Sequence, residues 1–199
     1  MKTLKEIVIT KGLDIALDYL DRDIERNLPK LVDWVEKFDV NDNVKKELDA
    51  VKRTALTPGS NWNRYIVNIW NSIDLDVIKQ FFTNFIVYSN IEGKSKRTEV
   101  GRVNDCNVPW AILLDPTASC NLKCIGCWAS EYDTAASMTL DTLDSIVLQG
   151  KDMGTYMYIF TGGEPLVRKK DVIKLCEKHD DCQFMAFTNG TLIDEGFAQ

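Results

Sequence analysis

Three cysteines in one short loop are the residues whose type and spacing point most directly to chemistry. Cys120, Cys124 and Cys127 lie within eight residues, in a chain of 199 residues that has six cysteines in total. A disulfide framework uses cysteines in pairs, and a closed structural zinc site uses four ligands. Three thiolates instead match three irons of a cubic 4Fe–4S cluster, which leaves the fourth iron open to a chelating molecule.

Two other short segments have the composition of ligand-binding loops. They are "TGGEP" at 161–165, called here the GGEP segment, and "TNG" at 188–190, called the TNG turn. Paired glycines let the backbone approach a ligand closely, because they carry no side chain. Glu164 is able to pair with a cationic amine of such a ligand. Asn189 would place a small amide beside the cavity that holds the ligand.

The cysteine loop (residues 116–128), the GGEP segment and the TNG turn each follow an expected strand. Short apolar runs predict strands at 110–115, 156–161 and 183–188. Helical patterns begin at 139, 169 and 192. This alternation predicts a parallel α/β sheet with crossover helices. Because ligands bind at the carboxyl ends of parallel strands, the three segments should face one shared site.

The first half of the chain has helical periodicity and no pattern that indicates chemistry. Apolar residues recur at three- and four-residue spacing from Gly12 to about Glu92. Pro29 is expected to kink or divide a helix, Thr57–Gly59 to break the pattern, and Asp74 to cap a later helix. Seven aromatic residues are expected to form a helix-packing core rather than a ligand box. They are Trp62, Tyr65, Trp70, Phe81, Phe82, Phe85 and Tyr88.

A change in composition separates the two halves. The polar, glycine-containing stretch 93–108 predicts a linker or lead-in between a helical region, residues 1–92, and an α/β region, residues 109–199. The expected fold class is therefore α/β, preceded by an all-helical N-terminal region.

Composition and charge argue against several broad classes. The chain has 24 Lys and Arg against 30 Asp and Glu, for a net charge of −6, and its lysines form no stripe. This disfavours binding to nucleic acid through phosphate neutralisation. The sequence shows neither the apolar run of a signal peptide nor about 18 consecutive apolar residues. We therefore expect a cytoplasmic protein with no membrane partner, whose clustered cysteines are metal ligands or catalytic thiols.

The C-x3-C-x2-C spacing after a first strand, together with Gly162-Gly163-Glu164-Pro165 after a second, resembles the radical S-adenosylmethionine (radical SAM) superfamily. The resemblance covers about residues 110–199. It implies a partial (βα)6 TIM-like barrel, of which this chain holds the first three strand–helix units. Since a complete core has six units, it also implies a fragment, a core completed by a second chain, or a degenerate protein. With an open sheet edge, the isolated chain is expected to be poorly stable.

The resemblance also implies a set of ligands and a reaction. The three cysteines of the loop would ligate a 4Fe–4S cluster whose open iron chelates S-adenosylmethionine. The residues implied to bind this cofactor are Gly162, Gly163, Glu164 and Pro165, and Asn189 lies beside the same cavity. An electron donor such as ferredoxin or flavodoxin would reduce the cluster, and the cofactor would be cleaved to a 5′-deoxyadenosyl radical that abstracts hydrogen from a substrate. The substrate, whether peptide, protein or small molecule, and the catalytic residues are not indicated.

The cysteine loop departs from the family pattern at one position. Gly126 stands where many members have an aromatic residue, and Trp128 follows the last cysteine. Trp128 either shields the cluster or the adenine, or is ordinary packing. Asp115 and Glu131 flank the loop and either orient polar atoms or lie on the surface.

Two alternatives to an enzyme stay open. A non-catalytic iron–sulfur-binding remnant or regulatory protein would keep the loop without the reaction. A structural zinc site would need Cys106, Cys182 or His179 as a fourth ligand and leaves the GGEP segment unexplained. We expect His179 to be a solvated cation at a helix end, and Cys176 and Cys182 to be small buried hydrophobes.

Overall fold

The computed structural model describes residues 4–38, 45–129 and 136–198. The chain divides into two compact units, Met1–Thr83 and Asn84–Gln199. One hydrophobic core lies in the first unit and another in the second.

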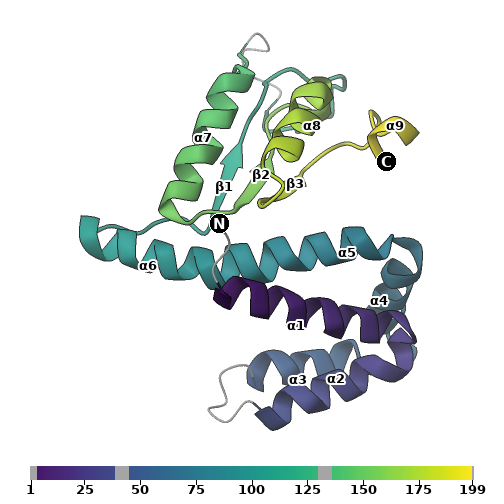
Figure 1. Ribbon diagram of the computed structural model, residues 1–199. Coiled ribbons are helices and arrows are strands. Elements are labelled where there is room, and N and C mark those ends of the chain that lie inside the picture. The colour runs from purple at the N-terminus through teal and green to yellow at the C-terminus, as the bar shows by residue number, and fades with distance from the viewer. Residues whose placement is uncertain (1–3, 39–44, 130–135, 199) are drawn as a thin grey trace. The chain divides into compact units, whose positions relative to one another are not determined.

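The described residues of the first unit are mainly helical, as the periodicity predicts (Figure 1). The helices are α1 (Leu4–Asp21), α2 (Ile24–Phe38), α3 (Lys45–Thr54), α4 (Asn61–Ser72) and α5 (Leu75–Phe82). Their core includes the buried side chains of Leu17, Leu20, Ile24, Trp70 and Ile78. Thr57–Gly59 lies in turns between α3 and α4, as expected. The Asp74 side chain caps α5, because it accepts a hydrogen bond from the backbone N–H of Asp76.

The expectation that Pro29 divides a helix is wrong. Pro29 lies inside α2, and the helical break falls instead at residues 22–23. The side chain of Asp23 accepts a hydrogen bond from Arg26 N over 3.0 Å. Such an acceptor satisfies a free backbone donor in the first turn of a helix. The cap therefore sets the start of α2, and the proline does not.

The aromatic residues of this half do not form a single core, contrary to expectation. Trp70 is buried, and Phe82 packs against the same cluster. Trp62, Tyr65 and Phe81 are 58%, 56% and 43% exposed. The rings of Trp62 and Tyr65 contact each other edge to face, with centroids 5.9 Å apart. Because only one stripe of an amphipathic helix faces the core, aromatic residues on the other stripe stay at the surface.

The polar stretch 93–108, expected to be a linker or lead-in, is mostly helical. A π-helix, η1 (Thr83–Glu92), leads into helix α6 (Gly93–Asn104). The Arg97 guanidinium donates a hydrogen bond to the Gly154 carbonyl over 2.6 Å, and burial lowers the pKa of Arg97. The hydrogen bond from Arg97 to the Gly154 carbonyl thus attaches this polar stretch to the rest of the second unit.

The second unit contains the expected parallel sheet (Figure 1). Its strands are β1 (Ala111–Leu114), β2 (Met157–Phe160) and β3 (Gln183–Ala186), in the order β1-β2-β3. Both pairs are parallel, with Leu114 opposite Phe160 and Phe160 opposite Ala186. The other elements are α7 (Leu140–Met153), the 3-10 helix η2 (Pro165–Arg168), α8 (Lys169–Lys178) and α9 (Glu195–Ala198). The predicted strand–helix alternation is confirmed, and the fold is consistent with part of a βα barrel.

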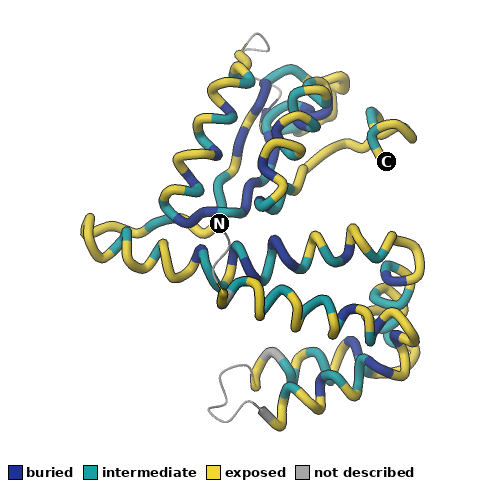
Figure 2. Tube along the Cα trace, viewed as in Figure 1, coloured by how far each residue is buried: buried dark blue, intermediate teal, exposed yellow. Residues whose placement is uncertain are grey.

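Helices α7 and α8 pack on one face of the sheet, where the core of the unit lies (Figure 2). This core joins strand residues Leu114, Tyr158 and Phe160 to helix residues, including Leu143 of α7 and Leu175 of α8. Side chains alternate between the two faces of a strand, so the neighbours of these core residues along each strand point to the other face of the sheet. Two side chains on that other face, Leu113 and Met185, are 62% and 46% exposed.

Candidate functional site

The cysteine loop, the GGEP segment and the TNG turn begin side by side at the carboxyl edge of the sheet. The Thr161 N–H donates a hydrogen bond to the Leu114 carbonyl over 2.8 Å, and the Phe187 N–H donates to the Phe160 carbonyl over 2.9 Å. These two bonds continue the pairing of β1 with β2 and of β2 with β3. The three segments therefore begin at the same edge of the sheet.

The paired glycines bring the GGEP segment against the backbone of the cysteine loop. The Gly163 N–H donates to the Thr117 carbonyl over 3.0 Å, and the Glu164 N–H donates to the Ser119 carbonyl over 2.9 Å. A Cβ on Gly163 would lie 2.3 Å from the Ser119 carbonyl oxygen, and Gly162 has a φ of 97°. The sequence suggested that these glycines make room for a ligand. In the structure, the absence of a side chain at these glycines allows the backbone of the cysteine loop to approach closely.

Glu164 is buried, and both of its carboxylate oxygens accept hydrogen bonds from this chain. Oε1 accepts from the Thr188 hydroxyl over 2.7 Å and from the Leu166 N–H over 2.9 Å. Oε2 accepts from the Asn189 N–H over 2.8 Å. These three donors offset the cost of removing the carboxylate from water. The carboxylate thus joins the GGEP segment to the TNG turn.

Asn189 reaches from the TNG turn to the first cysteine of the loop. Its side-chain amide donates to the Asn121 carbonyl oxygen Oδ1 over 3.0 Å, and its Nδ2 lies 4.0 Å from Cys120 Sγ. Asn121 in turn donates to the Thr191 hydroxyl over 2.8 Å. The Leu122 N–H also points to Cys120 Sγ, at 3.4 Å. The Cys120 end of the loop therefore lies against the TNG turn.

The three cysteines lie on one loop, and none of the three is in a disulfide. Cys120 and Cys124 are exposed and Cys127 is half-buried. The Cys127 N–H donates to the Cys124 carbonyl over 3.3 Å, and Gly126 between them has a φ of 75°, which favours glycine. No three His, Cys, Asp or Glu side chains of the described residues gather closely enough to hold a metal ion. As a donor set, three thiols on one short loop fit a cluster with three protein ligands.

The remaining cysteines and the single histidine make their contacts elsewhere. His179 is 2% exposed, and its Nε2 lies 2.9 Å from Asp144 Oδ1, so the expectation of a solvated cation is wrong. The histidine is buried because the end of α8 packs toward α7. Cys182 is buried, as expected, and burial raises its pKa. Burial also raises the pKa of Cys176, to about 11. Cys106 is exposed beyond the end of α6.

A hollow beside the cysteine loop has a largely apolar lining. It is lined by Leu113, Cys127, Trp128, Thr161, Gly162, Gly163, Phe187 and Thr188. Trp128 is 64% exposed there and is not part of the core. Sequence reasoning missed Leu113 and Phe187. Their place near the ends of expected strands was the available signal, because such residues face either the core or the site.

Asp115 is exposed and directly follows β1. Its Oδ1 accepts a hydrogen bond from the Thr161 hydroxyl, so it orients a polar group of the hollow. Glu131, the other carboxylate expected to flank the loop, lies outside the described residues.

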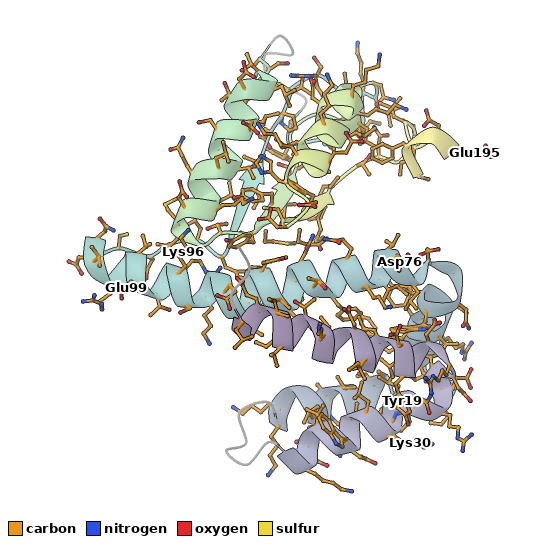
Figure 3. The ribbon with its side chains drawn as sticks, viewed as in Figure 1. Tyr19, Lys30, Asp76, Lys96, Glu99 and Glu195 are labelled. Atoms are coloured by element: carbon orange, nitrogen blue, oxygen red, sulfur yellow. The ribbon has the colours of Figure 1, made fainter. Side chains whose placement is uncertain are left out.

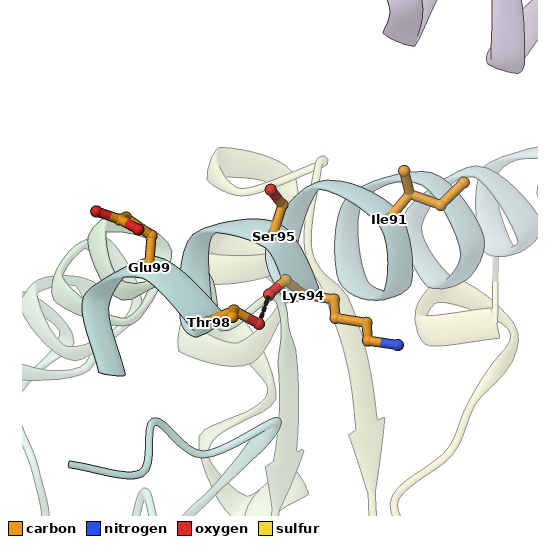
Figure 4. A pocket seen from close by; sticks show the side chains of 5 residues that line it. All are labelled: Ile91, Lys94, Ser95, Thr98 and Glu99. Carbon is orange, nitrogen blue, oxygen red and sulfur yellow. Dashed lines mark hydrogen bonds between the residues drawn. The ribbon is translucent and has the colours of Figure 1, made fainter. Parts of the chain in front are cut away.

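Other surface hollows contain none of the predicted site residues. One runs along η1 and α6, lined by Ile91, Lys94, Ser95, Thr98 and Glu99 (Figure 4). Another lies between α1 and α2, where Figure 3 labels Tyr19 and Lys30. The carboxyl edge of the sheet is therefore the strongest candidate site among the described residues.

A thiol-bearing loop at the carboxyl edge of a parallel sheet defines an α/β protein with a candidate metal-cluster site. Residues 114–199 match the model of the radical SAM superfamily. The resemblance indicated by the sequence is thus confirmed for these residues, which are similar to the radical SAM superfamily.

Three relatives share about 30% identity with part of the chain. Fe-coproporphyrin III synthase of Methanosarcina barkeri is 32% identical over 92 residues, which are 44% of this chain and 23% of the relative. AdoMet-dependent heme synthase of the same organism is 32% identical over 91 residues, 44% of this chain and 26% of the relative. An uncharacterized protein of Archaeoglobus fulgidus is 31% identical over 88 residues, 43% of this chain and 21% of the relative. The matches span about a quarter of the length of these relatives. No solved structure matches the chain significantly.

No helix in the described parts of the chain combines the length and apolar character needed to cross a membrane.

Proposed function

We propose that this chain is a radical SAM enzyme or a fragment of one, or of a protein derived from one. Cys120, Cys124 and Cys127 would hold a 4Fe–4S cluster, and the open iron of that cluster would take S-adenosylmethionine. The observation that carries the proposal is the set of three thiols, none of them in a disulfide, on one loop at the carboxyl edge of a parallel sheet. When bound, the cluster and its cofactor supply one-electron cleavage of S-adenosylmethionine and hydrogen abstraction from a substrate.

The residues around the loop have distinct parts in this proposal. Gly162 and Gly163 would line the hollow beside Cys127, with Pro165 next to them in the GGEP segment, and Asn189 would border the Cys120 end. Leu113, Trp128 and Phe187 supply apolar surface around the hollow, which would help to exclude water from a bound cofactor. The loop has to bring the three thiols together when the cluster binds.

The substrate is not part of the proposal. Two relatives are named as synthases of haem or Fe-coproporphyrin III, but the identity covers about a quarter of each. We therefore carry over the shared superfamily chemistry and propose an electron donor of the ferredoxin or flavodoxin kind as a partner, together with a cytoplasmic location.

A non-catalytic iron–sulfur-binding protein is the second candidate. The exposed face of the three-stranded sheet favours it for the chain in isolation, because Leu113 and Met185 remain uncovered there. The two candidates make the same prediction for cluster binding and opposite predictions for a response to S-adenosylmethionine.

The test is electron paramagnetic resonance of anaerobically reconstituted, dithionite-reduced chain, with and without S-adenosylmethionine. A reduced 4Fe–4S signal that changes on addition of the cofactor would support the enzyme. A cluster signal that does not respond would support the non-catalytic protein. The C120A, C124A and C127A variants should lose the signal, whereas the matched C106A variant should keep it. Zinc retention without any cluster would overturn the proposal.

A further inference from the structure

The buried carboxylate of Glu164 lies where the segments of the site meet. The residue is 1% exposed, and its side chain caps the 3-10 helix η2 through the Leu166 N–H. The same oxygen, Oε1, accepts from the Thr188 hydroxyl, while Oε2 accepts from the Asn189 N–H. Every one of these donors belongs to the chain, and two of them lie in the TNG turn.

The backbone of Glu164 is attached to the cysteine loop at the same time. Its N–H donates to the Ser119 carbonyl over 2.9 Å, directly before Cys120. A single residue is thus bonded to the segment after β1 through its backbone and to the segment after β3 through its side chain. This double attachment needs no ligand.

The attachment extends from the TNG turn back to Cys120. The Asn189 N–H donates a hydrogen bond to Glu164 Oε2. The side-chain amide of Asn189 contacts Asn121 and lies 4.0 Å from Cys120 Sγ. The contacts of the carboxylate are buried or half-buried, whereas those of the Asn189 amide are exposed. The carboxylate is therefore the stronger part of this connection, since a hydrogen bond in water is offset by competing water.

We infer that Glu164 is a positioning residue: its carboxylate holds the TNG turn against the GGEP segment and so fixes the Cys120 end of the cysteine loop. It acts through Thr188 and Asn189 rather than through contact with the methionine amine. The inference deepens the proposed function and rests on it for the statement that the loop carries a cluster. The hydrogen bonds themselves are a property of the chain without cofactor.

Glu164→Gln tests the positioning role with almost no change of shape. A carboxamide accepts on one side only, so a single Gln cannot accept from Leu166, Thr188 and Asn189 together. Either the Leu166 or the Asn189 N–H must lose its acceptor. The readout is amide hydrogen exchange of the full 199-residue chain without iron or cofactor, in peptides that cover 164–168 and 187–191.

We expect exchange in one of these two peptides to become about 10-fold faster, the effect of losing one charge-assisted hydrogen bond. A peptide from α7 should be unchanged. Thr188→Val removes one donor without changing the shape and should raise exchange at 187–191 in the same direction. Thr188→Ser keeps the hydroxyl and should behave as the wild type.

Alkylation of individual cysteines separates positioning from general loss of structure. Where exchange of Glu164→Gln shows that the Asn189 N–H has lost its acceptor, the alkylation rate at Cys120 should rise relative to that at exposed Cys106, because the Asn189 amide is then no longer held beside the loop. Buried Cys182 should stay protected. A merely structural role would expose Cys182 as well, and that result would overturn the inference.

The outcomes distinguish this inference from the proposed function. Unchanged exchange in Glu164→Gln, with loss of the spectral response to S-adenosylmethionine, would show that Glu164 contacts the cofactor and would overturn the positioning role. Faster exchange with retained protection of Cys182 would support that role. It would do so even if the wild-type chain assembled no 4Fe–4S cluster, a result that would refute only the proposed function.

Discussion

Gly163→Ala is predicted to destabilise the second unit by forcing the GGEP segment away from the cysteine loop. The added Cβ would lie 2.3 Å from the Ser119 carbonyl oxygen and 2.6 Å from the Ala118 carbonyl oxygen. Both obstacles are backbone atoms, so no side-chain rotation relieves the contact. The Gly163 and Glu164 N–H groups would also lose alignment with the carbonyls of Thr117 and Ser119.

The magnitude follows from these two effects. Overpacking of a close contact costs about 1–3 kcal/mol. Two weakened backbone hydrogen bonds add about 0.5–1.5 kcal/mol each. The free energy of unfolding should therefore fall by about 2–6 kcal/mol, a large share of the roughly 5–15 kcal/mol that stabilises a typical domain.

Pulse alkylation of Cys182 across a urea gradient measures this change in the second unit alone, because Cys182 is buried in its core. The urea midpoint should fall with little change in slope. Gly196→Ala is the matched control, since its Cβ would meet no atom closer than 3.8 Å. A Gly163→Ala variant within about 0.5 kcal/mol of the wild type would refute the steric reasoning.

Two further predictions concern the same unit. Hydrogen bonding from Lys178, and then from His179, lowers the pKa of Asp144. This stabilisation is present above the ordinary aspartate pKa of about 3.9 and is lost as the pH falls through the lowered value of the folded state. Asp144→Asn should therefore destabilise the unit by about 1 kcal/mol at pH 6, and urea unfolding should show the difference vanish at acid pH. Secondly, the exposed side chains of Leu113 and Met185 should make the chain self-associate, and light scattering should detect less association after Met185→Lys. A sharp, reversible melt of a monomer would contradict that prediction.

Local patterns were sufficient to predict the elements of the α/β region and the common edge of its three unusual segments. Each strand is a short apolar run followed by a polar segment, and parallel pairing then brings the following segments together. Local patterns did not predict helix α6 in stretch 93–108, where Arg97 contacts a carbonyl 57 residues further along the chain. They failed for His179 as well, whose burial depends on Asp144 of the neighbouring helix.

The sequence by itself determined the chemistry that this chain is able to carry: three closely spaced thiols, a GGEP segment and a TNG turn, each after a strand. Residue types and their spacing along the chain are sufficient to indicate this chemistry, because both are properties of local sequence. Only the tertiary structure decided what the side chains contact. The glycines meet the chain's own backbone, and the Glu164 carboxylate accepts from Thr188 and Asn189. Such contacts join residues far apart in sequence, and they exist only once the strands have paired.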